Sequence, residues 1–306
     1  MTRGTTPSEP QAGRPRVVVG IDGSAAALDA VRWGADAAAR RGLPLRLVHA
    51  CAPVPLRHSR STTDAADHVD LLVDRGTQFL REAVAFATHA RPGLQTEVDL
   101  RVGHPVEVLL DAATGARVLV TATRGVGGIR EAVLGSVSSA VAEHAGCPVV
   151  VVRGRDGADP AARVWPVVVG VDGTPASEAA VAVAFEEAAV RGVSLLAVHT
   201  WSDVAFSGLW TALPLVIDWD AVEADEQRLL DERLAGWQEK HPDVTVIRQV
   251  CRARPAHRLV ELSHEAGLVV VGSRGHHRYA GVGLGSTSRA VLHAAHCPVA
   301  VVRPTR

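Results

Sequence analysis

The chain has few aromatic residues and no surplus of charge of either sign. Aromatic side chains make up 4% of the 306 residues, whereas hydrophobic residues make up 47%. We therefore expect large cores built mainly from Ala, Val and Leu. The 32 basic and 33 acidic side chains leave a formal net charge of −1. That balance provides no basic surface of the kind that binds nucleic acid or an anionic membrane, so neither is an expected partner.

Cysteine is also scarce, and its spacing excludes the common metal and redox motifs. The four cysteines are Cys51, Cys147, Cys251 and Cys297, and none of them forms a C-x-x-C pair. No histidine lies at metal-ligand spacing from a second cysteine, so no metal site is predicted from these residues. Cys147 and Cys297 each precede a Pro-Val run, where we expect burial beside a strand. Reduced thiols are typical of a cytoplasmic protein, which is the localisation we expect.

The sequence lacks the apolar segments that direct a chain into or across a membrane. Residues 1–15 are polar and have none of the apolar core of a signal peptide, so we expect a disordered N-terminal tail. No apolar run approaches the roughly 18 residues that span a bilayer. These features predict a soluble protein.

An internal duplication is the dominant feature that is present. VVVGIDGS at residues 17–24 recurs as VVVGVDGT at residues 167–174, and CPV at 147–149 recurs at 297–299. These pairs are separated by 150 residues, and 13 of 21 positions are identical between 133–153 and 283–303. A constant offset between two copies predicts two homologous domains. We place them at residues 16–153 and 164–306, joined by a linker rich in Gly, Asp and Pro at 154–163.

Each copy alternates short β-branched runs with helical patterns. Ser24 and Thr174 stand where helix N-caps are expected, and Gly42 and Gly192 stand where those helices end. Strands separated by helices predict two doubly wound, mainly parallel five-stranded sheets flanked by helices, an α/β arrangement of the Rossmann-like type. In such a sheet, ligands bind beyond the carboxyl ends of the strands, where the strand order reverses. The strands are expected at 17–21, 45–50, 96–102, 118–122 and 149–153, and at 167–171, 195–200, 244–250, 268–272 and 299–303.

A glycine-rich loop follows the fourth expected strand of the second copy. It begins at Gly272 and reads G-x2-G-x9-G-S, ending at Ser286. Glycines let the backbone turn and present N–H groups to an anion, and a helix that begins at Ser286 adds free N–H groups and its dipole. Arg274 or Arg278 supplies a cation. The loop therefore predicts a phosphate site, although a simple connection between strand and helix is the alternative.

The first copy carries the same loop with one substitution. Residues 122–136 read A-x2-G-x9-G-S, so Ala122 stands where the second copy has Gly272. If the backbone has a positive φ at this position, Ala122 costs on the order of 1 kcal/mol or more. If the position is ordinary strand, the methyl group only narrows the site. The sequence leaves both open, and it makes the second copy the more complete site.

Together these motifs resemble those of the universal stress protein family, in particular its ATP-binding branch and its tandem-domain members. The resemblance rests on VVVG[IV]DG[ST] at each domain start, on the glycine loop and on the closing CPVxVVR, and it covers about residues 17–303. It implies a fold like that of the adenine nucleotide alpha hydrolases. It also implies ATP as the ligand, with Mg²⁺ as a companion whose protein ligands are not identified.

The resemblance assigns roles to individual residues at the nucleoside. It implies that Asp22 and Asp172 lie at the nucleoside, although a turn or capping role is the alternative for an Asp-Gly pair. It further implies that Gly20 and Gly170 line the adenine pocket and that the backbone of Ala50 and Thr200 contacts adenine. The preceding histidines, His49 and His199, are expected to be structural.

The resemblance also implies contacts to phosphate and ribose around the glycine loop. The residues concerned are Ala122, Arg124, Gly125, Gly135, Ser136, Val137 and Ser138 in the first copy, and Gly272, Ser273, Arg274, Gly275, Arg278, Gly285, Ser286, Thr287 and Ser288 in the second. The tryptophans at 201, 210, 219 and 237 are expected to pack a helix or a lid over the core.

The site composition favours a regulator over an enzyme. Phosphoryl transfer needs placed carboxylates that hold a metal, and neither phosphate loop contains an Asp. We therefore expect an ATP-binding sensor in the stress response, with at most weak hydrolysis and with a protein partner that the sequence does not identify. A slow nucleotide-processing enzyme of the related α/β superfamily and a nucleotide-free scaffold are the alternatives. In the family the closing strand pairs across a dimer two-fold, so we expect an intrachain pseudo-dimer and, by analogy, a homodimer.

Overall fold

The computed structural model describes residues 15–52, 62–123, 134–153, 164–201, 218–275 and 283–304. Residues 1–14 of the tail expected at 1–15 and the whole linker at 154–163 therefore lie outside the described residues. The first half (residues 15–153) contains β1 (Val17–Ile21), α1 (Ala25–Arg41), β2 (Leu45–Cys51), α2 (Thr62–Ala90), β3 (Thr96–Val102), α3 (Pro105–Ala112), β4 (Val118–Ala122), α4 (Ser136–His144) and β5 (Val149–Val152). The second half (residues 164–304) contains β6 (Val167–Val171), α5 (Pro175–Arg191), β7 (Leu195–Trp201), α7 (Trp219–Lys240), β8 (Val246–Arg252), α8 (Pro255–Leu262), the short 3₁₀ helix η2 (Ser263–Glu265), β9 (Leu268–Gly272), α9 (Ser286–Ala294) and β10 (Val299–Val302).

The first helix of each half begins and ends where the sequence predicts. The side chains of Ser24 and Thr174 cap α1 and α5, each accepting a hydrogen bond of 3.2 Å from the backbone N–H three residues later. Gly42 and Gly192 end these helices in the left-handed conformation, with φ of 60° and 65°. Both predicted boundaries are confirmed, and each cap fixes the direction in which its helix leaves the carboxyl end of the preceding strand.

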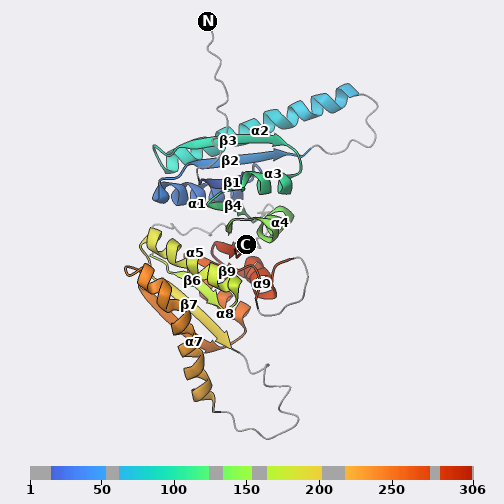
Figure 1. The fold of residues 1–306 in the computed structure, drawn as a ribbon. Coiled ribbons are helices and arrows are strands. Elements are labelled where there is room, and N and C mark those ends of the chain that lie inside the picture. Colours follow the sequence, from blue (N-terminus) through green and yellow to red (C-terminus); the bar gives the residue numbers. More distant parts are fainter. Residues whose placement is uncertain are drawn as a thin grey trace, which may run out of the picture.

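The two five-stranded units join edge to edge into one ten-stranded sheet. Its order is β3-β2-β1-β4-β5-β10-β9-β6-β7-β8, and Figure 1 shows the two halves following one another along it. Neighbouring strands within each half are parallel, whereas β5 and β10 are antiparallel. Val150 lies opposite Ala300, its own equivalent at the 150-residue offset. A local two-fold axis therefore passes between these residues, and the expected intrachain pseudo-dimer is present.

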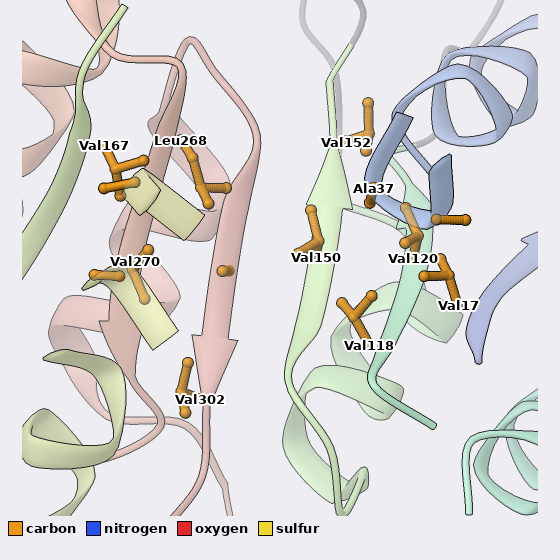
Figure 2. Packing of buried hydrophobic residues seen from close by; sticks show 14 of the residues in the cluster. Val17, Ala37, Val118, Val120, Val150, Val152, Val167, Leu268, Val270 and Val302 are labelled. Atoms are coloured by element: carbon orange, nitrogen blue, oxygen red, sulfur yellow. The ribbon is translucent and has the colours of Figure 1, made fainter. Parts of the chain in front are cut away.

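Helices cover both faces of the sheet and bury two apolar layers. One layer packs α1, α2, α5 and α7 against the sheet, and the other packs α3, α4, α8 and α9 against its opposite face. The strands between them are continuous apolar runs, as expected where both faces are buried. Figure 2 shows how Val150 and Val302, from the two closing strands, belong to the first of these layers. The core is thus continuous across the junction of the halves.

Cys147 and Cys297 lie beside the closing strands, as predicted. Their exposed fractions are 9% and 0%. Burial raises the pKa of the Cys147 thiol to about 11, which keeps it protonated at neutral pH. These cysteines therefore act as small apolar core residues.

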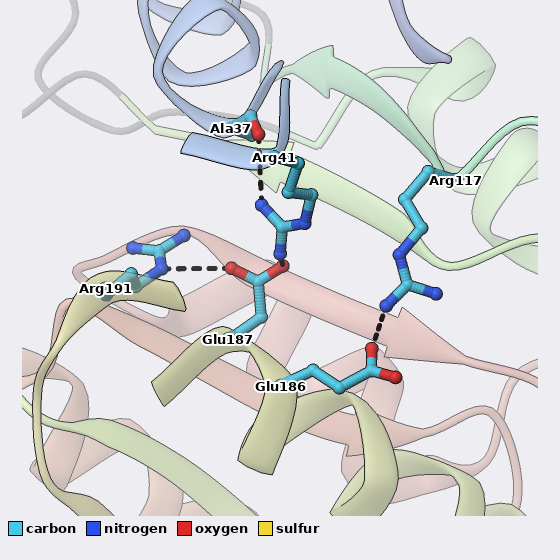
Figure 3. Close-up of polar contacts among 6 residues, drawn as sticks. All are labelled: Ala37, Arg41, Arg117, Glu186, Glu187 and Arg191. Carbon is cyan, nitrogen blue, oxygen red and sulfur yellow. Dashed lines mark hydrogen bonds and ion pairs between the residues drawn. The ribbon is translucent and has the colours of Figure 1, made fainter. Parts of the chain in front are cut away.

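The helices at the junction are held by a buried ion cluster, shown in Figure 3. Glu187 of α5 binds both Arg41 of α1 and Arg191, its neighbour one turn on, and the Arg191 bond is 3.0 Å. Arg41 and Arg191 are equivalent residues of the two copies, whereas the equivalent of Glu187 is Ala37. One carboxylate therefore neutralises two symmetry-related guanidinium groups. Glu187 has a side-chain exposure of only 8%.

None of the helices in the described part of the chain, including the 29-residue α2, combines the length and the apolar character that crossing a bilayer requires.

Candidate functional site

A cavity of about 630 Å³ lies at the carboxyl edge of the sheet in the second half. The ends of β6, β7 and β9 form its floor, and the strand order reverses between β6 and β9. This is the position at which doubly wound sheets bind ligands, and the volume falls within the roughly 300–1,000 Å³ typical of small-molecule pockets. Predicted site residues that line it are Gly170, Asp172, Thr200, Gly272, Arg274, Gly275, Gly285, Ser286, Thr287 and Ser288.

Asp172 stands at the centre of this edge and organises the turn after β6. Its Oδ1 accepts hydrogen bonds from the backbone N–H and the hydroxyl of Thr174, at 3.0 and 2.7 Å. Asp22 makes the same pair of bonds to Ser24, at 2.9 and 2.6 Å. The turn role that the sequence left open is therefore present in both halves. It also fixes the carboxylate of Asp172 at the cavity wall.

The glycine loop approaches this carboxylate closely. A methyl group built on Gly275 would lie 2.9 Å from Oδ2 of Asp172, so glycine lets the loop approach without displacing that carboxylate. The loop is closed at its base by the N–H of Gly285, which donates to the carbonyl of Ser273 at 2.9 Å. Ser273 itself is buried and its N–H donates to Val302 at 2.7 Å, so it lies behind the wall rather than on it.

The first turn of α9 faces the cavity with its N–H groups. Gly285 is the N-cap residue, and among the described residues no side chain caps this helix end. Its positive dipole end and free N–H groups therefore remain available to an anion. The hydroxyl of Ser288 donates to the carbonyl of Gly272 at 2.5 Å, and Ser138 makes the equivalent bond to Ala122 at 2.8 Å. These two serines tie the helix start to the strand end.

The open question about Ala122 has a clear answer. Among the described residues, no residue other than glycine has a positive φ, and Gly272 is not in the left-handed region either. The strained alternative is therefore wrong, and the position is ordinary strand. A methyl group on Gly272 would lie 2.7 Å from the carbonyl carbon of Ala176. The start of α5 consequently packs more closely on β9 than the start of α1 can on β4.

The histidines of the second strands are structural, as expected, but one has a further partner. Nδ1 of His49 lies 2.7 Å from the carbonyl oxygen of Ile21, and Nδ1 of His199 lies 2.7 Å from that of Val171. His199 also lines the cavity, where its Nε2 lies 2.9 Å from Oε2 of Glu226. Sequence reasoning missed this second contact.

The wall that α7 contributes was also missed. Glu226, Leu230 and Arg233 line the cavity, and their spacing of i, i+4 and i+7 places them on one face of a helix. That spacing was a usable signal. Trp201 lines the cavity as well and stacks on Trp219 of α7 with ring centroids 5.6 Å apart, which agrees with the expected packing role of the tryptophans.

In the first half, a different side chain lies against the turn that follows the first strand. Phe79 of α2 lies against the turn after β1, where a methyl group on Gly23 would overlap its ring. The same ring meets His49 edge-on, with centroids 5.6 Å apart. Phe79 is the equivalent of Leu229 in the second half. An aromatic ring thus covers the Asp22 turn in the first half.

The remaining predicted residues pack against neighbouring helices, begin α4 or lie outside the described residues. Gly170 and Gly20 leave room for leucine side chains of the flanking helices. A methyl group on Gly170 would lie 3.0 Å from Leu259, and a methyl group on Gly20 would lie 3.1 Å from Leu109. Ala50 packs against the apolar layer of α3 and α4. Gly135 is the N-cap residue of α4, which Ser136 and Val137 begin. Arg124, Gly125, Arg278 and Trp210 lie outside the described residues.

Comparison with known proteins gives a consistent result over both halves. The model of the universal stress protein family matches residues 13–153 and 166–303. Universal stress protein Rv2005c of Mycobacterium tuberculosis is 42% identical over 297 residues, which cover 94% of this chain and 96% of that protein. Universal stress protein Rv2623 of the same organism is 42% identical over 294 residues, with the same two shares covered.

A solved universal stress protein from Archaeoglobus fulgidus has the same fold over nearly the whole chain. Its TM-score is 0.69 at 18% identity, and the match covers 94% of this chain and 96% of that one. Because the family model matches each half and the mycobacterial relatives align over 94% of this chain, the chain belongs to the universal stress protein family, as a member with two copies of the domain.

Proposed function

We propose that the protein binds ATP in the second-half cavity and acts as a nucleotide-dependent regulator in the stress response, with little or no hydrolysis. One observation carries the proposal. The cavity at the reversal of strand order brings together Asp172, the described glycines of the loop (Gly272, Gly275 and Gly285) and the uncapped first turn of α9. These are the parts that a nucleotide with several phosphates requires.

The phosphate end of ATP fits the loop side of the cavity. Backbone N–H groups at the start of α9 supply donors that need no ionisable partner. Arg274 and Arg233 line the same cavity and supply positive charge. Together they balance the negative charge of the phosphates, which an apolar cavity alone would exclude.

The nucleoside end fits the apolar side of the cavity. Val198, Leu230, Leu259 and Val271 line it, and all four are buried. A base stacked among such side chains replaces water at a surface that is otherwise apolar. Asp172, at the junction of the apolar and polar parts, accepts hydrogen bonds and is therefore suited to the sugar or the base.

The proposal that the protein regulates rather than catalyses rests on what surrounds the cavity. In the described part of the chain, no group of three or more His, Cys, Asp or Glu side chains is arranged to hold a metal ion. Oδ1 of Asp172 is already used by the turn. We therefore propose that Mg²⁺ enters as part of MgATP. A cytoplasmic location, supported by the absence of C-x-x-C pairs and by buried free cysteines, and a homodimer, by analogy with the family, belong to the same proposal.

The two halves are proposed to bind ATP unequally. The second half has the close packing at Gly272 and the polar face of α7, whereas the first half has Ala122 and the ring of Phe79 over the Asp22 turn. We expect one nucleotide per chain at low concentration and a second, weaker one in the first half. Quantifying the nucleotide that co-purifies with the chain measures this ratio directly.

The decisive experiment measures ATP affinity by isothermal titration calorimetry in matched glycine variants. A methyl group at Gly285 would lie 3.4 Å from Arg274, an ordinary contact, so Gly285→Ala leaves the fold intact but narrows the loop. We expect it to weaken ATP binding at least tenfold. Gly236→Ala on α7, where a methyl group meets nothing within 4 Å, is the control and should not change the affinity.

The alternatives predict other results. A scaffold would show no ATP binding to the unmodified chain at all. An enzyme would release ADP or AMP at catalytic rates from added ATP. Equal affinities of Gly285→Ala and Gly236→Ala would show that ATP binds elsewhere.

A further inference from the structure

The wall of the second-half cavity contains one carboxylate that the nucleotide-binding motifs do not include. Glu226 lies on α7 with its side chain 26% exposed, and it lines the cavity beside His199. In the described part of the chain, His199 is its one hydrogen-bonding partner. The carboxylate thus has an oxygen in contact with the protein and further acceptor capacity towards the cavity.

The contact with His199 fixes the position of the Glu226 side chain. Nδ1 of His199 lies 2.7 Å from the carbonyl oxygen of Val171, which can only accept. Its Nε2 lies 2.9 Å from Oε2 of Glu226. This contact is a hydrogen bond that ties the carboxyl group of Glu226 to the ring. The histidine, itself anchored on Val171, therefore holds Glu226 in place at the cavity wall.

The first half provides an internal comparison, because it has the histidine without the carboxylate. His49 makes the same 2.7 Å contact to the preceding strand. The equivalent of Glu226 is Gly76, where a methyl group would already lie 2.5 Å from Cδ2 of His49. The carboxylate is therefore a property of the second half alone.

We infer that Glu226 is a specificity-determining residue of the second-half site, where it accepts a hydrogen bond from a donor group on the nucleoside of the bound nucleotide. An ionised carboxylate recognises donors and repels acceptors. A nucleoside offers two kinds of donor, the exocyclic amine of the base and the hydroxyls of the ribose. This inference rests on the proposed function, and His199 serves in it as the positioning residue.

The test compares analogues that each lack one donor. Calorimetric affinities are measured for ATP, for inosine triphosphate, which has an oxygen in place of the amine, and for 2′-deoxy-ATP and 3′-deoxy-ATP. The chains compared are the unmodified protein, Glu226→Gly, which copies the first half, and His199→Gln. Glu232→Gln is the control, because Glu232 is exposed on the same helix and does not line the cavity.

The unmodified chain should bind ATP at least tenfold more tightly than the one analogue that lacks the recognised donor, since that analogue leaves the carboxyl group without its hydrogen-bonding partner. In Glu226→Gly that preference should fall to about one, while Glu232→Gln should retain it. His199→Gln should reduce the same preference, which a purely structural loss would not change.

Two failures are distinguishable. If the unmodified chain binds none of these nucleotides, the proposed function itself fails. If it binds ATP but Glu226→Gly leaves every ratio between ATP and the analogues unchanged, the proposed function stands and the role of Glu226 is overturned.

Discussion

The two halves of the chain have the same strand order and the same capped turns, yet they present different side chains to the carboxyl edge of the sheet. In the second half, Gly272 lets α5 pack closely on β9, and Glu226 and Arg233 give α7 a polar face. In the first half Ala122 occupies the first of these positions, and Phe79 covers the Asp22 turn. The shared motifs account for the shared backbone, whereas the differences lie at the first position of the glycine loop and on the helices that cover the site. A duplicated fold thus preserves the backbone around a site more readily than the side chains that line it.

The junction of the halves shows a second difference, and there it stabilises the pairing. At a two-fold axis, equivalent residues meet. If the second copy also had alanine at the position equivalent to Ala37, Arg41 and Arg191 would lie together without a carboxylate between them. Glu187 stands at that position in the second copy only, and it binds both arginines. Because the copies can diverge within one chain, a single carboxylate serves a symmetric pair of cations.

The largest expected effect comes from making the junction symmetric. Glu187→Ala copies the Ala37 of the first half and leaves two largely buried guanidinium groups without their anion. Removing one partner of a buried ion pair costs about 3–5 kcal/mol, so we expect a loss of about 3 kcal/mol in the free energy of unfolding, measured in urea.

Glu186→Ala is the matched control for this variant. Glu186 pairs with Arg117 across the same junction, but both side chains are more than a third exposed. We expect a loss below about 1 kcal/mol, as for other exposed pairs. Equal losses in the two variants would contradict the role assigned to burial of Glu187.

The sequence predicted the strands and the helix starts because these depend on local signals. The strands at β1, β3, β4 and β9 have the predicted bounds, and the capping residues mark both helix starts. β8 begins two residues later than predicted, at Val246, because its apolar run starts in the preceding turn. Local signals of this kind need no knowledge of what packs against them.

The side-chain contacts that line the site and join the halves could not be predicted from local signals. The periodicity of α7 shows which residues share a face, but not that Glu226 contacts His199 of the neighbouring strand. Glu187 likewise reads as a solvated glutamate, since its two arginines are brought together only by the β5–β10 pairing. Such contacts depend on how helices pack on the sheet, and the repeat alone does not fix that.

The next largest effect is expected when Gly272 is replaced by alanine, the residue at the equivalent position of the first half. Gly272→Ala places a methyl group 2.7 Å from backbone of α5, so we expect a cost of about 1–3 kcal/mol from overpacking. The displaced segment includes Ser177, whose hydroxyl accepts the N–H of Asp172 at 3.0 Å, and ATP affinity should fall with stability.

Ala122→Gly is the reciprocal variant. It removes a methyl group without forcing any backbone apart, so it should cost at most about 1 kcal/mol through the flexibility of glycine in a strand. Thermal unfolding and ATP titration of both variants provide the comparison. If Gly272→Ala leaves both quantities unchanged, the close approach of α5 has no energetic role.

A smaller effect on stability is expected at Phe79, with a clear effect on binding. Phe79→Leu copies Leu229 and uncovers the Asp22 turn, at a cost of roughly 1 kcal/mol because the residue remains apolar. We expect the number of ATP molecules bound per chain to rise towards two. Leu229→Phe should have the opposite result in the second half. An unchanged stoichiometry in both would show that this ring does not separate the halves.

The smallest expected effect is a difference in pH dependence. In the second half the rings of His264 and His296 stack with centroids 3.7 Å apart, whereas the first half has Thr114 and Gly146 at these positions. Partial desolvation of its largely exposed ring, followed by the charges of His264 and Arg153, lowers the pKa of His296 below its ordinary value of 6.5. The unfolded chain therefore binds this proton more readily, and the stability present above pH 6.5 is lost as the pH falls below it.

Replacing His264 by Thr, as in the first half, removes one of the charges that lower the pKa of His296. The free energy of unfolding, measured between pH 7.5 and 5.5, should then fall less steeply towards acid pH than in the unmodified chain. Solvent screening keeps the difference below about 1 kcal/mol, because His296 is exposed. His89→Thr, at an exposed position on α2, should leave the slope closer to that of the unmodified chain. A steeper slope in His264→Thr would show that the stacked pair favours the protonated form, and the sign of this difference between the halves would be reversed.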